Sequence, residues 1–546
     1  MRLPICPMRT PVFVALLAAL LSPALLRAQL TPRSWQEITH FQAGPTPYAP
    51  LMEFWYELAA RSPEVRIQSL TPTPGDHEVT LVTISSEEIF SPEDAVRSGK
   101  TVVLVTNAVH GGEPAGKEAS QLVARDLVSG PLRPLLDDVI VLFVPLLNPD
   151  GGEVGRRESE DGLDLNRDYI KLESPEIRAL VTRVINLWNP DIHVDTHHGG
   201  SPPYTLTWQG TLNPAADAEL RAYPYEVIFP RIRAALRARD FDGFDYQGEL
   251  TVGGERGWGS TSVEPRKQHV YAGMINTIGI LLETPDNSMR LLGNGTRLET
   301  VPLSDRYAYQ VEGQRIALTE ILKVAAEDRE EIRAITSGSR DRAVRAGESF
   351  EDSDRLILDY RLVSRGREDV WMPDSTVPGG YQRQEVEVFL EYEPTRTISR
   401  PLGYILLPSM ERALPFLLDH DIVVYRLAEP AVLELEVYSA AGVRELGYFE
   451  KHNLRTVDVE LSSRSIELPA GAFYIPMAQP RGNLIGYLLE PETDDNLVTW
   501  GYVDQALNRA LRDEFGERLL PMMRIVKEPL LPALEPVQLE GYDWSR

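Results

Sequence analysis

The chain contains almost no cysteine, because Cys6 is the only one among 546 residues. It lies in the N-terminal segment that we expect to be removed, so the mature protein would contain no thiol. This excludes disulfide bonds and thiolate catalysis, and any metal site must be built from histidine and carboxylate side chains. An exported protein without disulfides is typical of a bacterial periplasm or exterior, where the size of the core stabilises it.

Positive charge is also scarce: Lys and Arg number 55 against 81 Asp and Glu, a formal net charge of −26. A protein that binds nucleic acid or an anionic membrane surface needs a basic face, so we expect neither partner.

Long hydrophobic runs are missing beyond the N-terminus. The run Pro11–Leu26 is short, is broken by Pro23 and is followed by a small-residue cleavage point at Ala28. This pattern predicts a secretory signal peptide over residues 1–28, with an uncleaved anchor as the alternative. After its removal we expect no membrane span and a periplasmic or secreted protein.

Strand and helix patterns alternate from about residue 75 to 335. Several strands are apolar along almost their whole length, which is typical of strands buried on both faces of a mostly parallel sheet. We therefore predict an α/β fold: a mixed, mostly parallel central sheet with helices on both faces. The elements that carry this prediction are the strands 78–85, 101–106, 138–147, 191–196 and 277–283 and the helices 113–127, 174–188 and 305–336.

The character of the chain changes at residues 337–355, which are polar and lack apolar runs. We predict a linker there. It would join a catalytic domain over residues 29–336, which opens with a helical segment over 29–72, to a β-rich α+β domain over residues 356–546. The role of this C-terminal domain and the oligomeric state are not predicted.

Four short motifs contain the residues suited to catalysis. They are His110–Glu113, Asp164–Arg167, Asp195–His197 and Glu283. Three of them lie at or just after the carboxyl end of a predicted strand, and the second lies in a long loop after one. In an open α/β sheet these ends border one crevice, so we expect the four motifs to meet.

His110, Glu113 and a second histidine would form a three-ligand Zn²⁺ site that leaves one position open for water, as catalytic zinc requires. His197 is the predicted third ligand because it lies nearest the end of its strand. His198 points to the other face and remains the alternative, whereas His193 is expected to be a buried structural residue. Glu283 ends an apolar strand, where burial would raise its pKa toward that of a general base.

These motifs, in the order HGGE, NPDGG, DLNR, SPE, DTH and LLET, resemble the zinc metallocarboxypeptidase (carboxypeptidase A-like) family over about residues 75–335. The resemblance implies that His110, Glu113 and His197 bind zinc and that Glu283 is the general base. The first motif has no arginine between its ligands, unlike that of the pancreatic-type members. The tyrosine that clamps substrate in the family cannot be placed, because Tyr271 lies near Glu283 but not at the spacing from it that the family has.

The resemblance also implies roles for the polar loop after the NPDGG motif. Arg156 or Arg157 would stabilise the oxyanion, with Arg157 weakly preferred. Asn166 and Arg167 would bind the terminal carboxylate of the substrate, for which a planar guanidinium is well suited. Asp164 would hold the outer nitrogen of His110. Asn166 and Arg167 could instead form a structural salt-bridge network, and Arg156 and Arg157 could both be solvated surface charge.

The function that these features predict is an exported, zinc-dependent metallocarboxypeptidase that hydrolyses the C-terminal peptide bond of peptides through an activated water. The main competing function is that of a zinc-dependent deacylase or amidase that acts on N-acyl amino acids or peptidoglycan stem peptides. An inactive binding protein that retains its metal would also carry these motifs. So would a protein whose C-terminal domain does the main work by binding a polymer or a partner.

Overall fold

The structure is a computed structural model, and it describes residues 31–292, 295–504 and 519–538. The predicted signal segment, residues 1–28, lies outside these ranges. Within them, no helix is both long enough and apolar enough to cross a membrane.

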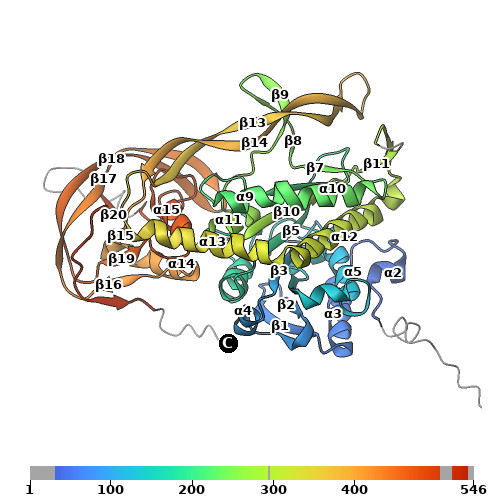
Figure 1. The fold of residues 1–546 in the computed structure, drawn as a ribbon, viewed down its shortest axis with the longest axis horizontal. Helices are drawn as coiled ribbons and strands as arrows, with labels where there is room; N and C mark the ends of the chain where they lie inside the picture. The colour runs from blue at the N-terminus through green and yellow to red at the C-terminus, as the bar shows by residue number, and fades with distance from the viewer. Residues whose placement is uncertain (1–30, 293–294, 505–518, 539–546) are drawn as a thin grey trace, which may run out of the picture.

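The central element is an eight-stranded mixed sheet in the order β1-β2-β4-β3-β5-β10-β6-β7 (Figure 1). Four of its seven neighbouring pairs are parallel: β4 with β3, β3 with β5, β5 with β10, and β6 with β7. Its strands are β1 (Val65–Pro72), β2 (Glu78–Ile84), β3 (Thr101–Asn107), β4 (Val139–Val144), β5 (Ile192–His198), β6 (Leu206–Gly210), β7 (Gly243–Asp245) and β10 (Ile278–Thr284).

Both faces of this sheet are covered, as the alternation along β3 shows. Val103 and Val105 belong to a core shared with one group of helices, whereas Val102 and Leu104 belong to a core shared with another. The first group is α3 (Tyr48–Arg61), α5 (Ala115–Ser129), α10 (Phe229–Arg237) and α12 (Leu303–Glu327), and the second includes α7 (Pro175–Leu180) and α11 (Gln268–Met274). The predicted α/β class is confirmed.

The C-terminal part is β-rich, as predicted. A seven-stranded sheet in the order β18-β17-β20-β15-β19-β16-β21 forms its body. Its strands are β15 (Gly403–Leu406), β16 (Tyr425–Leu427), β17 (Ala431–Phe449), β18 (His452–Leu468), β19 (Phe473–Pro476), β20 (Leu519–Ile525) and β21 (Leu534–Pro536), and α14 (Leu414–Asp419) and α15 (Gly482–Leu489) accompany them.

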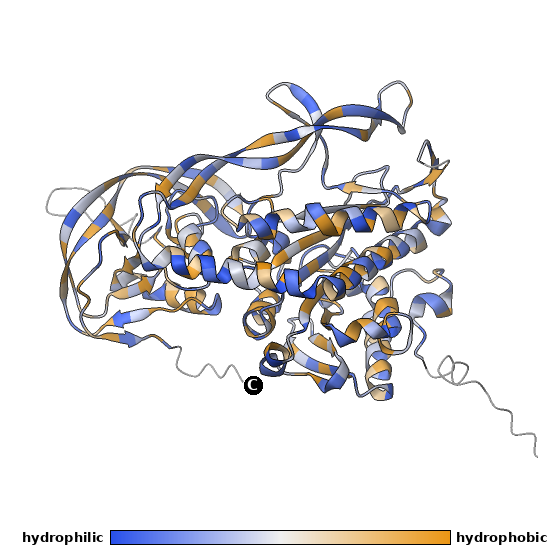
Figure 2. Cartoon of the chain, viewed as in Figure 1, coloured by the Kyte–Doolittle hydropathy of each residue, from blue (hydrophilic) through white to orange (hydrophobic). Residues whose placement is uncertain are grey.

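A second, four-stranded sheet joins the two parts of the chain, in the order β13-β14-β9-β8. The long hairpin of β13 (Arg355–Asp374) and β14 (Gly380–Ser399) pairs with the short hairpin of β8 (Gly248–Val252) and β9 (Glu255–Gly259). The long hairpins β13–β14 and β17–β18 extend from the body, and hydrophilic and hydrophobic residues alternate along them (Figures 1 and 2).

One hydrophobic core runs through both parts. The cluster that contains Leu104 of the central sheet also contains Leu356, Tyr404 and Leu484 of the C-terminal part. The two parts are therefore packed together through buried apolar side chains and not merely connected in sequence.

The segment predicted as a linker, residues 337–355, is mostly helical. Helix α13 (Arg329–Glu348) follows α12 almost directly, so the predicted single helix 305–336 is wrong in its end, and residues of the expected linker belong to α13. The reason is that α13 buries a stripe at helical spacing made largely of small or polar residues, which a search for large apolar residues overlooks. This stripe is Ile332, Thr336, Ser339, Ala343 and Gly347.

Two further expectations are corrected by the sheets. The segment 29–72 is not all helical, because β1 ends it as the edge strand beside β2, with only Val65 and Leu70 buried. The first strand of the C-terminal part, expected over 356–363, extends to Asp374, since it pairs with β14 along its length and buries Val370, Trp371 and Met372 near its outer end.

Helix α5 packs directly onto β5 at Gly116. A Cβ atom built there would lie 1.9 Å from Oγ1 of Thr196. This close approach brings the start of α5, and the loop before it, against the end of β5.

We expect Gly116→Ala to lower the free energy of unfolding by about 1–3 kcal/mol, because α5 must move away from β5. Gly338→Ala is the matched control in α13, where the new methyl would lie 3.2 Å from the flexible end of Arg342. This control should be neutral or stabilising by up to about 1 kcal/mol. Urea unfolding of both variants measures the difference, and equal stabilities would contradict the close packing of α5 on β5.

Candidate metal centre

The corner after β3 presents the first two candidate ligands. His110 and Glu113 lie in the turn between β3 and α5, and the Glu113 N–H donates to the His110 carbonyl (3.1 Å). Gly111 seats this turn against the backbone of residues 151–156, since a Cβ there would lie 2.2 Å from the Gly151 carbonyl carbon. Gly111 is therefore required by packing inside the protein, not by access of a substrate.

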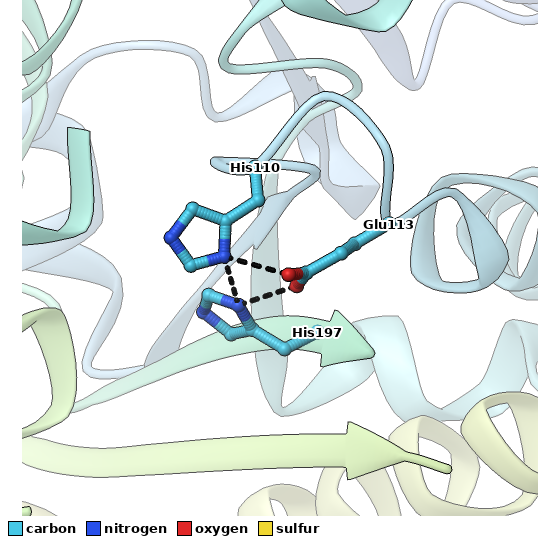
Figure 3. Close-up of side chains that lie close together, drawn as sticks. All are labelled: His110, Glu113 and His197. Carbon is cyan, nitrogen blue, oxygen red and sulfur yellow. Dashed lines mark hydrogen bonds and ion pairs between the residues drawn. The ribbon is translucent and has the colours of Figure 1, made fainter. Parts of the chain in front are cut away.

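The neighbouring strand supplies the third candidate. Strands β3 and β5 are parallel, and Thr106 pairs with Asp195, so His197 emerges beside the corner. Nδ1 of His110 and Nδ1 of His197 are 3.1 Å apart, and the Glu113 carboxylate oxygens lie 2.9 Å from each nitrogen (Figure 3). The three side chains converge on one point from two elements.

The outer nitrogens of both rings face carboxylates. Nε2 of His110 lies 3.0 Å from Asp164, and Nε2 of His197 lies 2.6 Å from Asp195. When each outer nitrogen keeps its proton and donates a hydrogen bond to its carboxylate, each Nδ1 presents a lone pair inward, next to the carboxylate of Glu113. Three electron-rich groups this close repel one another unless a cation lies between them, and two imidazoles with one carboxylate suit Zn²⁺.

The titration behaviour of the three groups reflects this crowding. Burial alone would lower the pKa of His197, but Asp195 and Glu113 raise it well above its usual value. Burial would raise the pKa of Glu113, but His110 and His197 lower it below its usual range. Among the described residues, this is the group of His and carboxylate side chains whose ligand atoms, all within 4.8 Å of one another, can hold a metal ion.

The other two histidines of β5 lie outside this group. Nε2 of His198 accepts a hydrogen bond from the Ala115 N–H at the start of α5 (2.9 Å). The buried His193 lies 3.3 Å from the Thr106 hydroxyl, and burial lowers its pKa to about 3. The structure thus brings His197, and not His198 or His193, to the other two candidates.

Glu283 lies next to the cluster on β10, which is parallel to β5 and pairs Glu283 with His197. The side chain is buried, and its Oε2 has no hydrogen-bond partner among the described residues. Burial raises its pKa to about 7, and the nearby Glu113 adds to this increase. A carboxylate with such a pKa can exchange a proton near neutral pH.

The structure separates the two adjacent arginines. Arg157 donates from Nε and Nη2 to Asp164 (3.1 and 2.8 Å), and its Nη1 lies 3.3 Å from Glu113. It lines the pocket that contains the three candidate ligands. Arg156 turns away and donates to the carbonyls of Glu158 and Ser159, so the structure does not bring it into the pocket.

Asn166 and Arg167 both line the pocket. Asn166 is already engaged, because its Oδ1 accepts from the Gln268 N–H (2.9 Å) and its Nδ2 lies 3.2 Å from Nε2 of His197. Arg167 donates to the Asn166 carbonyl (2.8 Å), and its nearest carboxylate, that of Asp164, is 4.0 Å away. Of the two, Arg167 has the greater capacity to bind an anion.

The sequence did not indicate the role of Asp195, or that Tyr246 and Lys267 belong to the site. Asp195 holds His197, and its position two residues earlier on the same strand face could have indicated this. Tyr246 and Lys267 line the pocket, but no pattern in the sequence pointed to them. Tyr246 lies far before Glu283 in sequence, because the β8–β9 hairpin and the segment after it come between them. Tyr271 is nearer to Glu283 in sequence, but it lies in the core and its hydroxyl hydrogen-bonds to His420.

Comparison with known proteins agrees with this geometry. A family model described as zinc carboxypeptidase matches residues 51–205, which include the three candidate ligands and end before Glu283. Carboxypeptidase 2 of Trichophyton rubrum is 24% identical over 443 residues, covering 77% of this chain and 76% of that protein. Carboxypeptidase 2 of Trichophyton equinum is 24% identical over 426 residues, covering 74% of each.

Among solved structures, the metallo-carboxypeptidase of Burkholderia cenocepacia is similar with a TM-score of 0.38 and 19% identity, covering 50% of this chain and 69% of that one. The carboxypeptidase A of Helicoverpa armigera has a TM-score of 0.39 at 15% identity, covering 57% and 80%. The family match over residues 51–205 and the sequence relatives agree with each other, and they show a hydrolase similar to the zinc carboxypeptidases.

Proposed function

We propose that this protein is an exported, zinc-dependent carboxypeptidase that releases the C-terminal residue of peptides. The observation that supports it most is the convergence of His110, Glu113 and His197 beside a carboxylate, Glu283, that has an unpartnered oxygen among the described residues. A metal-binding group and a free base in one pocket are the two components that hydrolysis of an amide requires.

His110, Glu113 and His197 would hold the ion. When bound, Zn²⁺ lowers the pKa of a water and polarises the carbonyl of the scissile bond. Asp164 and Asp195 keep the two imidazole rings oriented and their outer nitrogens protonated. With the ion bound, the rings would be neutral and their Nδ1 atoms would be the ligands.

Glu283 would act as the general base and then as the general acid. Its carboxylate removes the proton from the attacking water and passes it to the nitrogen of the leaving amine. Burial supports this double role, because a pKa of about 7 lets the group both accept and release a proton near neutral pH.

Arg157 would stabilise the negative charge that develops on the carbonyl oxygen. Two of its nitrogens are fixed by Asp164, which leaves Nη1 directed at the cluster. A guanidinium held in this way donates to the oxyanion without having to reorganise during the reaction.

Arg167 would bind the terminal carboxylate of the substrate. It borders the pocket, and no carboxylate of the described residues lies within hydrogen-bonding distance of it. Asn166 would contribute less to this binding than its motif suggests, since its Oδ1 already accepts from the Gln268 N–H. Selection for a free carboxylate at this position is what separates a carboxypeptidase from an internal peptidase.

Export is proposed from the hydrophobic run and cleavage point of residues 1–28. N-terminal sequencing of the protein recovered outside the cytoplasm should begin at Gln29. Recovery only of a chain that retains Met1 would contradict the cleavage.

The first expected result is release of free C-terminal amino acids from a peptide library by the zinc-loaded enzyme. Matched peptides with a C-terminal amide should react at least about 100-fold more slowly, because Arg167 then lacks a charged partner. Mass spectrometry of the products measures both. Cleavage of N-acyl amino acids without cleavage of peptides would favour a deacylase, and zinc binding without hydrolysis of either would favour a binding protein.

Glu283→Gln should retain its zinc and lose about 10²–10⁴-fold in kcat, because an amide cannot take the proton. His197→Ala should instead lose the metal, as measured by plasma emission analysis. Glu176→Gln is the matched control: Glu176 is also buried with a pKa raised to about 7, but it does not line the pocket. A fully active Glu283→Gln enzyme would remove Glu283 from the mechanism.

The pH dependence follows from the same carboxylate. A general base works when ionised, so kcat/KM should be fully present above the pKa of Glu283 and fall as the pH drops through it. A bound cation lowers this pKa, so the midpoint should lie at or below about 7. The residual rate of Glu283→Gln should lack this acid limb, and an identical limb in that variant would assign the titration to another group.

A further inference from the structure

The segments that line the pocket are in contact with the C-terminal part of the chain at three separate places. Each contact is made by a residue that is close in sequence to a residue of the pocket or is hydrogen-bonded to one. The three places are the loop that carries Asp164, the loop that carries Lys267, and the β8–β9 hairpin that follows Tyr246 and Gln247.

The first contact is made by the turn between β17 and β18. The Asp164 N–H donates to a carboxylate oxygen of Glu450 (3.1 Å). The next two residues hold the same loop, since Lys451 donates to the Asp161 carbonyl and His452 lies 2.7 Å from Glu173. The turn thus holds the loop whose Asp164 orients both His110 and Arg157.

The second contact is a buried ion pair. Arg266 donates from its backbone N–H and from Nε to the same oxygen of Asp495, both at 3.1 Å. Trp500 donates from its indole N–H to the other oxygen (3.1 Å), and the Arg266 guanidinium lies over the Trp500 ring. Asp495 is fully buried, so this pair fixes the loop whose next residue, Lys267, lines the pocket.

The third contact is the pairing of β14 with β9. Gly259 lies so close to β14 that a Cβ there would be 2.2 Å from the Phe389 carbonyl oxygen. The Gly259 carbonyl in turn accepts a hydrogen bond from the Gln247 N–H (3.1 Å). The β13–β14 hairpin therefore supports the segment that carries the pocket residues Tyr246 and Gln247.

We infer that the C-terminal part is a scaffold for the catalytic pocket, and that Glu450 and Asp495 are positioning residues for it. Glu450 acts through Asp164 on the metal ligand His110, and Asp495 acts through Arg266 on the loop of the substrate pocket. This inference rests on the proposed function for its kinetic consequences, but not for its effect on metal affinity.

Asp495→Asn tests the second contact, because it preserves size and removes the charge opposite Arg266. KM should rise about 10-fold with kcat changed less than about 2-fold, since the loop that it misplaces contacts substrate and not the base. Glu490→Gln is the control, as Glu490 is equally buried and pairs with Arg524 away from the pocket. It should lower the melting temperature and leave KM unchanged. An unchanged KM in Asp495→Asn would overturn the role of Asp495.

Glu450→Ala tests the first contact in a half-buried turn, where folding is not at risk. The affinity for Zn²⁺, measured by competition with a chromophoric chelator, should fall several-fold and less than about 10-fold, because Asp164 loses one of its supports. Glu445→Ala, an exposed change on the same hairpin, should leave it unchanged. Equal affinities in Glu450→Ala and the wild type would overturn the role of Glu450.

The metal measurement keeps the two ideas apart. If the wild type releases no amino acid while Glu450→Ala still weakens zinc binding, the proposed function fails and the scaffold stands. If the wild type is an active carboxypeptidase and neither variant differs from its control, the scaffold fails and the proposed function stands.

Discussion

The repulsion among three electron-rich groups is the constraint on which the pocket depends. Two imidazole nitrogens 3.1 Å apart, with a carboxylate 2.9 Å from each, are unfavourable without a cation. The raised pKa of His197 means that a proton can offset this repulsion, as a metal ion would. In either case the protein must hold the three groups at these distances. Asp164 and Asp195 do so from outside by fixing the two rings, and the rigid sheet does so from below.

The sheet provides rigidity because the residues involved lie where its central strands end. His110, His197 and Glu283 lie at the ends of β3, β5 and β10, which are neighbours and parallel. Gly111 and Gly116 remove the side chains that would separate the corner from the loop 151–156 and from β5. A small shift of any one element would widen the cluster, so close packing and ligand geometry are one requirement.

The remaining walls of the pocket are loops, and loops need external support. Here the support comes from the C-terminal part, through a turn, a buried ion pair and a strand pairing. The hydrophobic core that runs from Leu104 to Leu484 holds this part in place. A β-rich region whose sequence predicts no role thereby acquires a physical one, since the pocket loops share their hydrogen bonds with it.

Much of the site could be predicted from sequence because its ligands lie in short motifs at strand ends. His110, Glu113, His197, Glu283 and Asp164 were all predictable, since strand pattern and residue chemistry are local properties. The helix α13 was not, because it buries small and polar residues and gives no apolar signal.

What the sequence determined by itself is the class of fold and the place of the candidate ligands and of Glu283 near the ends of neighbouring strands. Tertiary structure decided which arginine faces the cluster, that Asn166 accepts from the Gln268 backbone, and that Tyr246 and Lys267 belong to the pocket. It also decided that Glu450 and Asp495, nearly 300 and about 230 residues away from their partners, hold the pocket loops. Contacts over such separations depend on how the elements pack, and no local pattern in the chain records them.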